Sequence, residues 1–151
     1  MLMKIRVFQI DHDKDEKHLA FRDYQTAIAK NGRIDESIYK QVYGGDVPCK
    51  NLEEVFALCN GDNRPAGYIA ESMSVSNVVE IEQGNNHCCF YVDSIGFKPV
   101  EFNIDKADRS DMMRIVVLEN ERVPYEAEIP HDIHAMQNVV DGCIEAIYFE
   151  E

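Results

Sequence analysis

The chain has 151 residues, of which 45% are hydrophobic and 28% are charged, so it can form a core in one ordinary domain or in two small ones. Its formal net charge is −13. A surface of that sign repels phosphate, which disfavours direct nucleic-acid binding and favours a protein partner with a basic surface. No apolar run reaches the roughly 20 residues of a membrane helix, and the N-terminus has no apolar signal segment. We therefore expect a cytoplasmic protein that does not enter a membrane.

The cysteine pattern supports this expectation. There are five cysteines, an odd number, and none forms a CxxC pair or a disulfide-scaffold spacing, so we expect reduced thiols. No glycine-rich phosphate-binding motif is present either. The sequence therefore predicts neither a cofactor nor a metal ion.

Apolar periodicity and capping residues predict a mixed series of elements in the first sixty residues. In chain order they are a strand over 4–10, a short strand over 17–21, a helix over 24–30 capped by Asp23, a segment over 37–43 that suits helix or strand and ends at Gly44-Gly45, and a helix from 52 that is capped by Asn51 and ended by Asn60-Gly61.

A β-hairpin is the clearest prediction of the sequence. A small-polar run from Ser72 leads into Val78-Val79-Glu80-Ile81, turns at Gly84-Asn85-Asn86, and returns as an aromatic strand that ends near Phe97. The polar residues at its entry and exit invite an active-site interpretation, but turn chemistry and core anchoring explain them better. They are Ser72, Ser74, Ser76, Asp93, Ser94, Gly96 and Phe97.

A polar segment over 105–111 is predicted to be a linker between an N-terminal mixed domain (1–104) and a small C-terminal unit (112–151). The second unit reads as strand, strand, helix, strand, with Asp132 as the helix cap. About 40 residues are near the lower limit for independent folding, so we expect the unit to pack on the first domain or on a second chain. The predicted fold class is α+β.

Residues 4–102 resemble the YodL-like domain, a module of phage and conjugative-element proteins. The resemblance is carried by Val7–Asp13, Asp15-Glu16-Lys17, Ala20-Phe21, Tyr39, Val42-Tyr43, Leu52–Phe56, Ser72–Val79 and Asp93–Phe97. The chain departs from the usual pattern at Asn77, where an Asp is expected, and this weakens any metal or acid role there.

Residues 112–151 resemble the start of a second family of unknown function that accompanies such modules. The matching positions include Val116-Val117, Pro124-Tyr125, Glu128-Ile129 and Ile144–Tyr148. Neither resemblance implies an enzymatic activity. Together they imply a non-enzymatic accessory protein of a mobile genetic element that binds a host protein or counteracts host defence. The alternative is a structural or adaptor module that self-associates, for example as a homodimer.

A third hypothesis is a hydrolase or nucleic-acid-modifying enzyme. His87 and Cys89 share one face of the hairpin strand, and either of them or Asp93 would supply the chemistry, but no oxyanion-hole signature accompanies them. His131 and His134 lie three residues apart, which is half of a zinc site, and no second pair has metal-ligand spacing. Solvated histidines explain that pair better.

The C-terminal unit is strongly acidic. Residues 1–110 carry 13 basic and 18 acidic side chains, whereas residues 111–151 carry 2 and 10. In the strand over 123–129, apolar residues alternate with acids, so one face is apolar and the other acidic. We expect either an ordinary solvated face or a surface that competes with nucleic acid for a basic host protein. The candidate interaction residues are Glu119, Glu121, Glu126, Glu128 and Glu145.

Overall fold

The computed structural model describes residues 2–140 and the backbone of residues 145–149. Its strands are β1 (Met3–Ile10), β2 (Tyr39–Val47), β3 (Val78–Gln83), β4 (Asn86–Val92), β5 (Phe97–Val100), β6 (Met112–Leu118), β7 (Tyr125–Pro130) and β8 (Glu145–Phe149). Its helices are α1 (Tyr24–Asn31), α2 (Leu52–Asn60) and α3 (Ile133–Val140), with short 3-10 turns η1 (His12–Lys14), η2 (Glu36–Ile38) and η3 (Ile104–Lys106).

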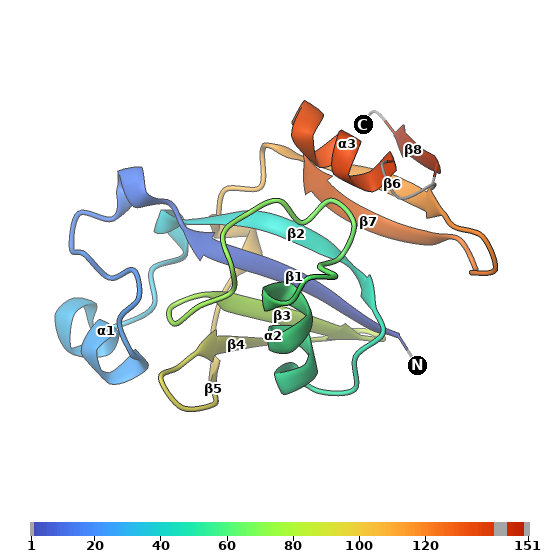
Figure 1. Cartoon of the computed structure of the whole chain (residues 1–151). Coiled ribbons are helices and arrows are strands. Elements are labelled where there is room, and N and C mark those ends of the chain that lie inside the picture. Colours follow the sequence, from blue (N-terminus) through green and yellow to red (C-terminus); the bar gives the residue numbers. More distant parts are fainter. Residues whose placement is uncertain (1, 141–144, 150–151) are drawn as a thin grey trace.

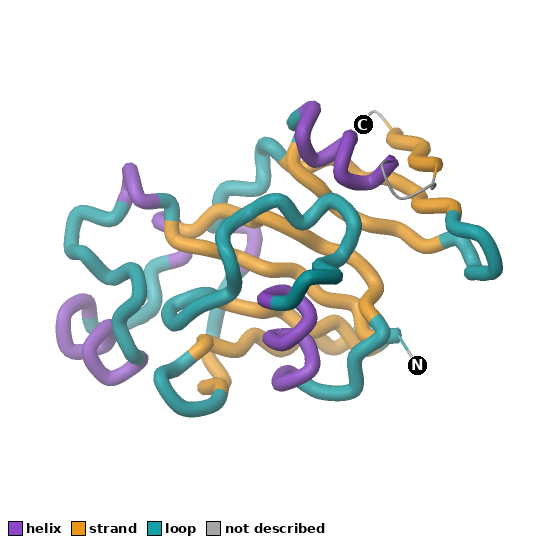
Figure 2. Tube along the Cα trace, in the orientation of Figure 1, coloured by secondary structure: helices purple, strands orange, loops and turns teal. Residues whose placement is uncertain are grey.

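The eight strands form one sheet in the order β5-β4-β3-β1-β2-β7-β6-β8, and neighbouring strands pair antiparallel (Figures 1 and 2). The α+β class predicted from the sequence is confirmed. The hairpin prediction is also confirmed, because β3 and β4 pair from Val78↔Tyr91 to Gln83↔Asn86. Within the described residues, no helix has the length and apolar character that a membrane span requires.

Two predicted helices begin at the predicted caps. The Asp23 carboxylate accepts a hydrogen bond of 2.8 Å from the Thr26 amide and starts α1, which ends at Gly32 with φ of +79°. The Asn51 side chain accepts one of 2.9 Å from the Glu54 amide and starts α2. These bonds satisfy amide groups that have no partner inside the helix, which is why both starts are readable from the sequence.

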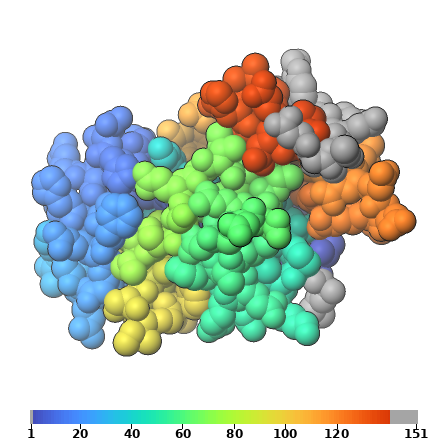
Figure 3. All heavy atoms as spheres, viewed as in Figure 1, coloured from blue at the N-terminus to red at the C-terminus, as the bar shows by residue number. Residues whose placement is uncertain are grey.

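One face of the sheet, called here the covered face, lies under α2, α3 and the long segment over 61–77 (Figures 1 and 3). Because strand side chains alternate, Ile5 and Val7 of β1 and Val79 and Ile81 of β3 face this side of the sheet. The largest core of the described residues lies here and includes Ile5, Val7, Val79, Ile81, Tyr43, Val55, Tyr68, Ile115, Ile129 and Val139.

The other face of the sheet is divided into two zones. At the end near α1 it carries a second core that includes Phe8, Tyr39, Val78 and Tyr91. Phe102 packs on this core, with its ring 5.2 Å from those of Phe8 and Tyr39. Toward the opposite end of the strands the same face becomes polar and carries the charged residues described below.

Two predicted elements differ from the structure. The short strand over 17–21 is wrong, because the two Asp15 carboxylate oxygens accept the Leu19 and Ala20 amides at 2.7 and 3.0 Å and fold the chain into turns. The expectation that Gly44-Gly45 ends its segment is also wrong. β2 continues through both glycines to Val47, since each pairs with β1 on one side and β7 on the other.

The predicted C-terminal unit, called here the C-terminal segment, adds its strands to the sheet of the predicted N-terminal domain, called here the N-terminal segment. Its strands, helix and last strand follow the predicted order as β6, β7, α3 and β8. β7 pairs with β2 at only two positions, Gly44↔Glu128 and Gly45↔Ala127, and the two strands diverge beyond them. The predicted linker also contacts β2, because the Gln41 amide donates to the Asp108 carbonyl at 2.9 Å.

Candidate binding groove at the junction of the two segments

The hairpin-exit residues have structural partners. The Asp93 carboxylate accepts the Tyr24 amide at 3.1 Å, at the start of α1, and the Ser94 amide at 2.8 Å. Gly96 has φ of +73°, a conformation that favours glycine, and its carbonyl accepts the Asp93 amide. The Phe97 ring packs edge-on against Phe56. These contacts anchor the hairpin.

The serines of the hairpin entry also contact the backbone and neighbouring side chains. The Ser72 hydroxyl accepts from Arg64 at 2.8 Å, and the Ser74 amide donates to the Asn77 side chain at 3.0 Å. Ser76 is buried, and its hydroxyl accepts the Phe21 amide at 3.0 Å. Asn77 is buried as well and accepts from Gln9, so this position takes part in an internal hydrogen-bond cluster.

The three residues of the enzyme hypothesis do not meet. His87 and Asp93 are six residues apart on or just beyond β4, which is about 20 Å of extended chain. The two ring nitrogens of His87 lie 3.4 Å from carboxylate oxygens of Glu80 and Glu82. Burial raises the pKa of the Cys89 thiol to about 12, with a further contribution from the Glu80 charge. A thiol in that environment stays protonated at neutral pH and is a poor nucleophile.

His131 and His134 are both exposed, at the start of α3. The Asp132 carboxylate accepts the His134 amide at 2.7 Å, as expected of a residue that caps the helix. Across the described part of the chain, no group of three or more potential ligands could hold a metal ion.

The predicted acidic residues whose side chains the structure describes do not form one free surface. Glu119 pairs with Arg122 at 3.1 Å and Glu126 with Arg114 at 3.6 Å. The Glu128 side chain is only 16% exposed, because it turns toward the centre of the sheet and pairs with Arg6. Glu121 is exposed, in the turn between β6 and β7. The side chain of Glu145 lies outside the described residues.

Glu128 belongs to a half-buried network, called here the Arg6 network, that joins the two segments. Arg6 donates to Glu80 at 2.6 Å and to Glu128 at 3.1 Å. Gln41 donates to Glu128 at 2.6 Å and accepts from Arg109 at 2.7 Å. Burial alone would raise the pKa of Glu128, but the hydrogen bonds from Arg6 and Gln41 and the nearby positive charges bring it below its ordinary value.

Gly44 makes this network possible. In the sheet register Gly44 lies between Arg6 on β1 and Glu128 on β7. A Cβ atom at Gly44 would lie 2.8 Å from the Glu128 carboxylate and 3.1 Å from the Gln41 amide nitrogen. The absent side chain therefore leaves the space through which Glu128 reaches Arg6.

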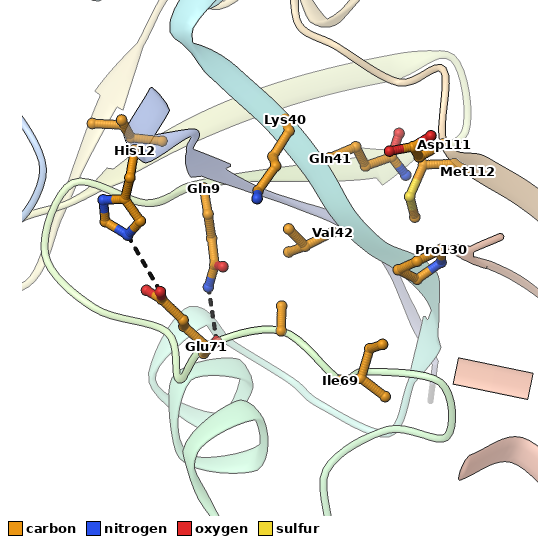
Figure 4. Close-up of a pocket in the computed structure, with 12 residues that line it drawn as sticks. Gln9, His12, Lys40, Gln41, Val42, Ile69, Glu71, Asp111, Met112 and Pro130 are labelled. Atoms are coloured by element: carbon orange, nitrogen blue, oxygen red, sulfur yellow. Dashed lines mark hydrogen bonds and ion pairs between the residues drawn. The ribbon is translucent and has the colours of Figure 1, made fainter. Parts of the chain in front are cut away.

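A groove of about 370 Å³, called here the junction groove, opens where β2 and β7 diverge (Figure 4). Its apolar lining comes from both segments of the chain and includes Val42, Ile69, Ala70, Met112 and Pro130. A volume of this size accommodates one or two amino-acid side chains or a small ligand. Grooves at the junction of structural units are common ligand-binding sites.

Polar side chains lie around the junction groove. His12 and Glu71 form a pair of 3.3 Å at one end, and Asp111 lies at the other (Figure 4). Gln9 donates to the Glu71 carbonyl at 2.8 Å and so holds the loop that forms one wall. Lys40 is exposed, and its ammonium points into the groove between these ends (Figure 4).

Phe21 lies beside the His12 end, with its ring centroid 5.9 Å from that of His12. The residue is 58% exposed, and its backbone φ is +66°, a conformation that is uncommon for a bulky residue. The Ser76 hydroxyl holds the Phe21 amide, and Ser76, with φ of +86°, is held in turn by the Tyr39 hydroxyl at 2.7 Å from its carbonyl. Hydrogen bonds from the buried residues Ser76 and Tyr39 therefore hold the backbone at Phe21 while its ring remains exposed.

The groove residues were not predicted from the sequence. His12 and Glu71 are 59 positions apart, and Met112 comes from the second segment. No local spacing brings them together. The exposed Phe21 carries a weak signal, since an aromatic residue beside charged residues suggests either a core position or a contact surface.

The fold is that of an α+β domain built on one antiparallel sheet, with a groove where the two segments join. Residues 4–102 match the model of the YodL-like domain, which is more than half of the chain. The chain therefore belongs to the YodL-like domain family. Residues 113–151 match a second family, described as a domain of unknown function (DUF3846), in agreement with the predicted two-segment arrangement. No curated protein and no solved structure matches the chain significantly.

Proposed function

We propose that this chain is a non-enzymatic accessory protein of a phage or conjugative element that acts by binding a host protein. The setting rests on the family resemblance described above, and counteracting a host defence is the role that fits such a setting. The binding surface that we propose consists of Phe21, His12 and the junction groove.

The observation that carries this proposal is the presentation of Phe21. A left-handed backbone costs a non-glycine residue roughly 1–2 kcal/mol. Because Phe21 is 58% exposed, its ring gains only part of the free energy that full burial would release. Strained conformations of this kind persist where surrounding structure enforces them, and they cluster at functional sites. The bonds to Ser76 supply that enforcement here.

Charge supports a partner with a basic surface. The chain carries a net charge of −13, and exposed acids without a cationic partner among the described residues lie next to His12, at Asp13 and Glu16. An acidic field of this kind accelerates the encounter with a basic protein. The acidic contact is thus proposed at the loop over 11–16 and at Glu71, because Glu128 is held inside the Arg6 network.

The test is quantitative affinity capture from host lysate with the full chain. Phe21→Asn removes the ring and keeps a residue that tolerates a positive φ. Ile95→Ser is the matched control, because Ile95 is a 91% exposed apolar residue in the β4–β5 turn. We expect at least one specific partner to be lost with Phe21→Asn and retained with Ile95→Ser. An identical partner list for both variants would contradict the proposal.

The same capture separates the two acidic surfaces. Asp13→Lys with Glu16→Lys reverses the charge beside His12, and Glu121→Lys with Glu126→Lys reverses it on the β6–β7 hairpin. All four side chains are exposed, so neither pair removes a buried contact. We expect the first pair to release the partner and the second to retain it. The opposite result would return the contact to the C-terminal unit.

A further inference from the structure

The junction groove has a chemistry that fits one kind of ligand. We propose that it binds an extended peptide segment of the partner protein in which a Lys or Arg lies near an apolar residue. The apolar side chain enters the groove, and the cation lies at the Phe21 end against Glu71. This inference rests on the proposed function, because it names the part of the partner that the same surface binds.

The floor of the groove accounts for the apolar residue. Val42 is buried beneath the opening, while Ile69 and Met112 form opposite walls that are partly exposed. A volume of about 370 Å³ is too small for a helix of about 10 Å diameter and suits a side chain with its neighbouring backbone. An extended segment is therefore the form of polypeptide that fits.

The His12 end accounts for the cation. His12 contacts both groups: its ring centroid is 5.9 Å from that of Phe21, and its Nε2 is 3.3 Å from the Glu71 carboxylate. A cation that takes the place of the imidazole meets an aromatic ring and a carboxylate, which is a favourable environment for a positive charge. A guanidinium is always charged and binds a carboxylate in two places, so it is a stronger partner for this pair than an imidazole. The Glu71 side chain is 61% exposed and accessible to it.

Lys40 sets the order of the peptide groups. Its ammonium points into the middle of the groove, between the His12–Glu71 pair and Met112 (Figure 4). A peptide cation is repelled from that position and is directed to the Glu71 end. A backbone carbonyl of the peptide suits that position, because its oxygen accepts a hydrogen bond and the ammonium group can only donate one. The groove therefore distinguishes a basic–apolar segment from a uniformly basic one.

The test is fluorescence anisotropy with the full chain and an arrayed set of labelled ten-residue Gly/Ser peptides. Each peptide carries one Arg and one Leu at separations of one to four residues. For every peptide, one counterpart has the Arg replaced by Glu and another has the Leu replaced by Ser. We expect the best Arg/Leu peptide to bind about tenfold more tightly than either counterpart, a ratio that corresponds to about 1.4 kcal/mol.

The protein variants locate the binding. Phe21→Asn and Glu71→Gln should each weaken the best peptide about fivefold to tenfold, and Ile95→Ser and Glu126→Gln should leave its affinity unchanged. Thermal unfolding of each variant verifies that it is folded. Equal binding of the Leu and Ser peptides, or equal binding to wild type and Phe21→Asn, would overturn the inference. If affinity capture finds a partner that depends on Phe21 while no Arg/Leu peptide binds, the proposed function stands and this inference fails.

Discussion

Replacing Glu128 by Ala should destabilise the fold much more than replacing Glu126, although both lie on one face of β7 two residues apart. Glu128→Ala removes an acceptor from Arg6 at 3.1 Å and from Gln41 at 2.6 Å. The side chains of Glu128 and Arg6 are only 16% and 14% exposed, so water replaces these bonds poorly. Glu126→Ala breaks a pair with Arg114 in which both side chains are 51% exposed.

The expected magnitudes follow from these contacts. Breaking a fully buried ion pair costs about 3–5 kcal/mol. Arg6 keeps its bond to Glu80, so we expect about 2–3 kcal/mol for Glu128→Ala. The exposed pair of Glu126 contributes at most about 0.5 kcal/mol. For a chain of this length, 1 kcal/mol corresponds to about 2–4 °C in Tm, so Glu128→Ala should lower the Tm by about 4–12 °C.

Thermal unfolding followed by circular dichroism measures both variants under one condition, and urea unfolding gives the free energies. The Arg6 network joins the two segments, so we expect one cooperative transition in the wild type. Equal destabilisation by Glu128→Ala and Glu126→Ala would refute the assignment of Glu128 to a half-buried network. It would also return Glu128 to the solvated acidic surface expected from the sequence.

Three further predictions concern the same structure. Because the pKa of Glu128 is lowered in the folded state, its contribution to stability is present above its ordinary pKa of 4.5 and is lost as the pH falls through the lower folded-state value. The Tm difference between wild type and Glu128→Gln should therefore be largest near neutral pH and shrink below pH 4.5. Gly44→Ala places a methyl group against Glu128 and should cost about 1–3 kcal/mol, but much less in a Glu128→Ala background, as a double-mutant cycle would measure; additive costs would contradict this coupling. In a thiol-labelling time course read by peptide mapping, the exposed Cys88 should react well before the partly buried Cys89, whose pKa is raised to about 12; equal rates would show that the Cys89 thiol is as accessible as that of Cys88.

The sequence predicted elements whose causes are local. The caps at Asp23 and Asn51 and the turn of the β3–β4 hairpin depend on residues within a few positions of one another. The path of β2 through Gly44 could not be predicted in this way. There the strand continues because Gly44 pairs with both β1 and β7, and its absent side chain leaves the space in which Arg6 meets Glu128, 122 positions away.

The candidate site was less predictable than the fold. Alternation predicted a strand over 123–129, and the structure has the alternating burial only from Tyr125 onward, with Val123 exposed. The pattern gave no sign that Glu128 is half-buried while Glu126 is exposed. That difference depends on the pairing of β7 with β2, which is a tertiary contact. The short strand expected over 17–21 was wrong because Asp15 binds the amides of that segment, and the resulting turns lead to the exposed Phe21.

Hydrogen–deuterium exchange of the full chain, with and without the partner obtained by affinity capture, tests the location of the binding surface most directly. We expect the partner to slow exchange in the segments over 9–21, 69–72 and 111–113, which contain Phe21 and line the junction groove. We expect no change in the β6–β7 turn over 119–124. Protection confined to that turn, with none at the groove, would place the binding surface on the C-terminal unit instead.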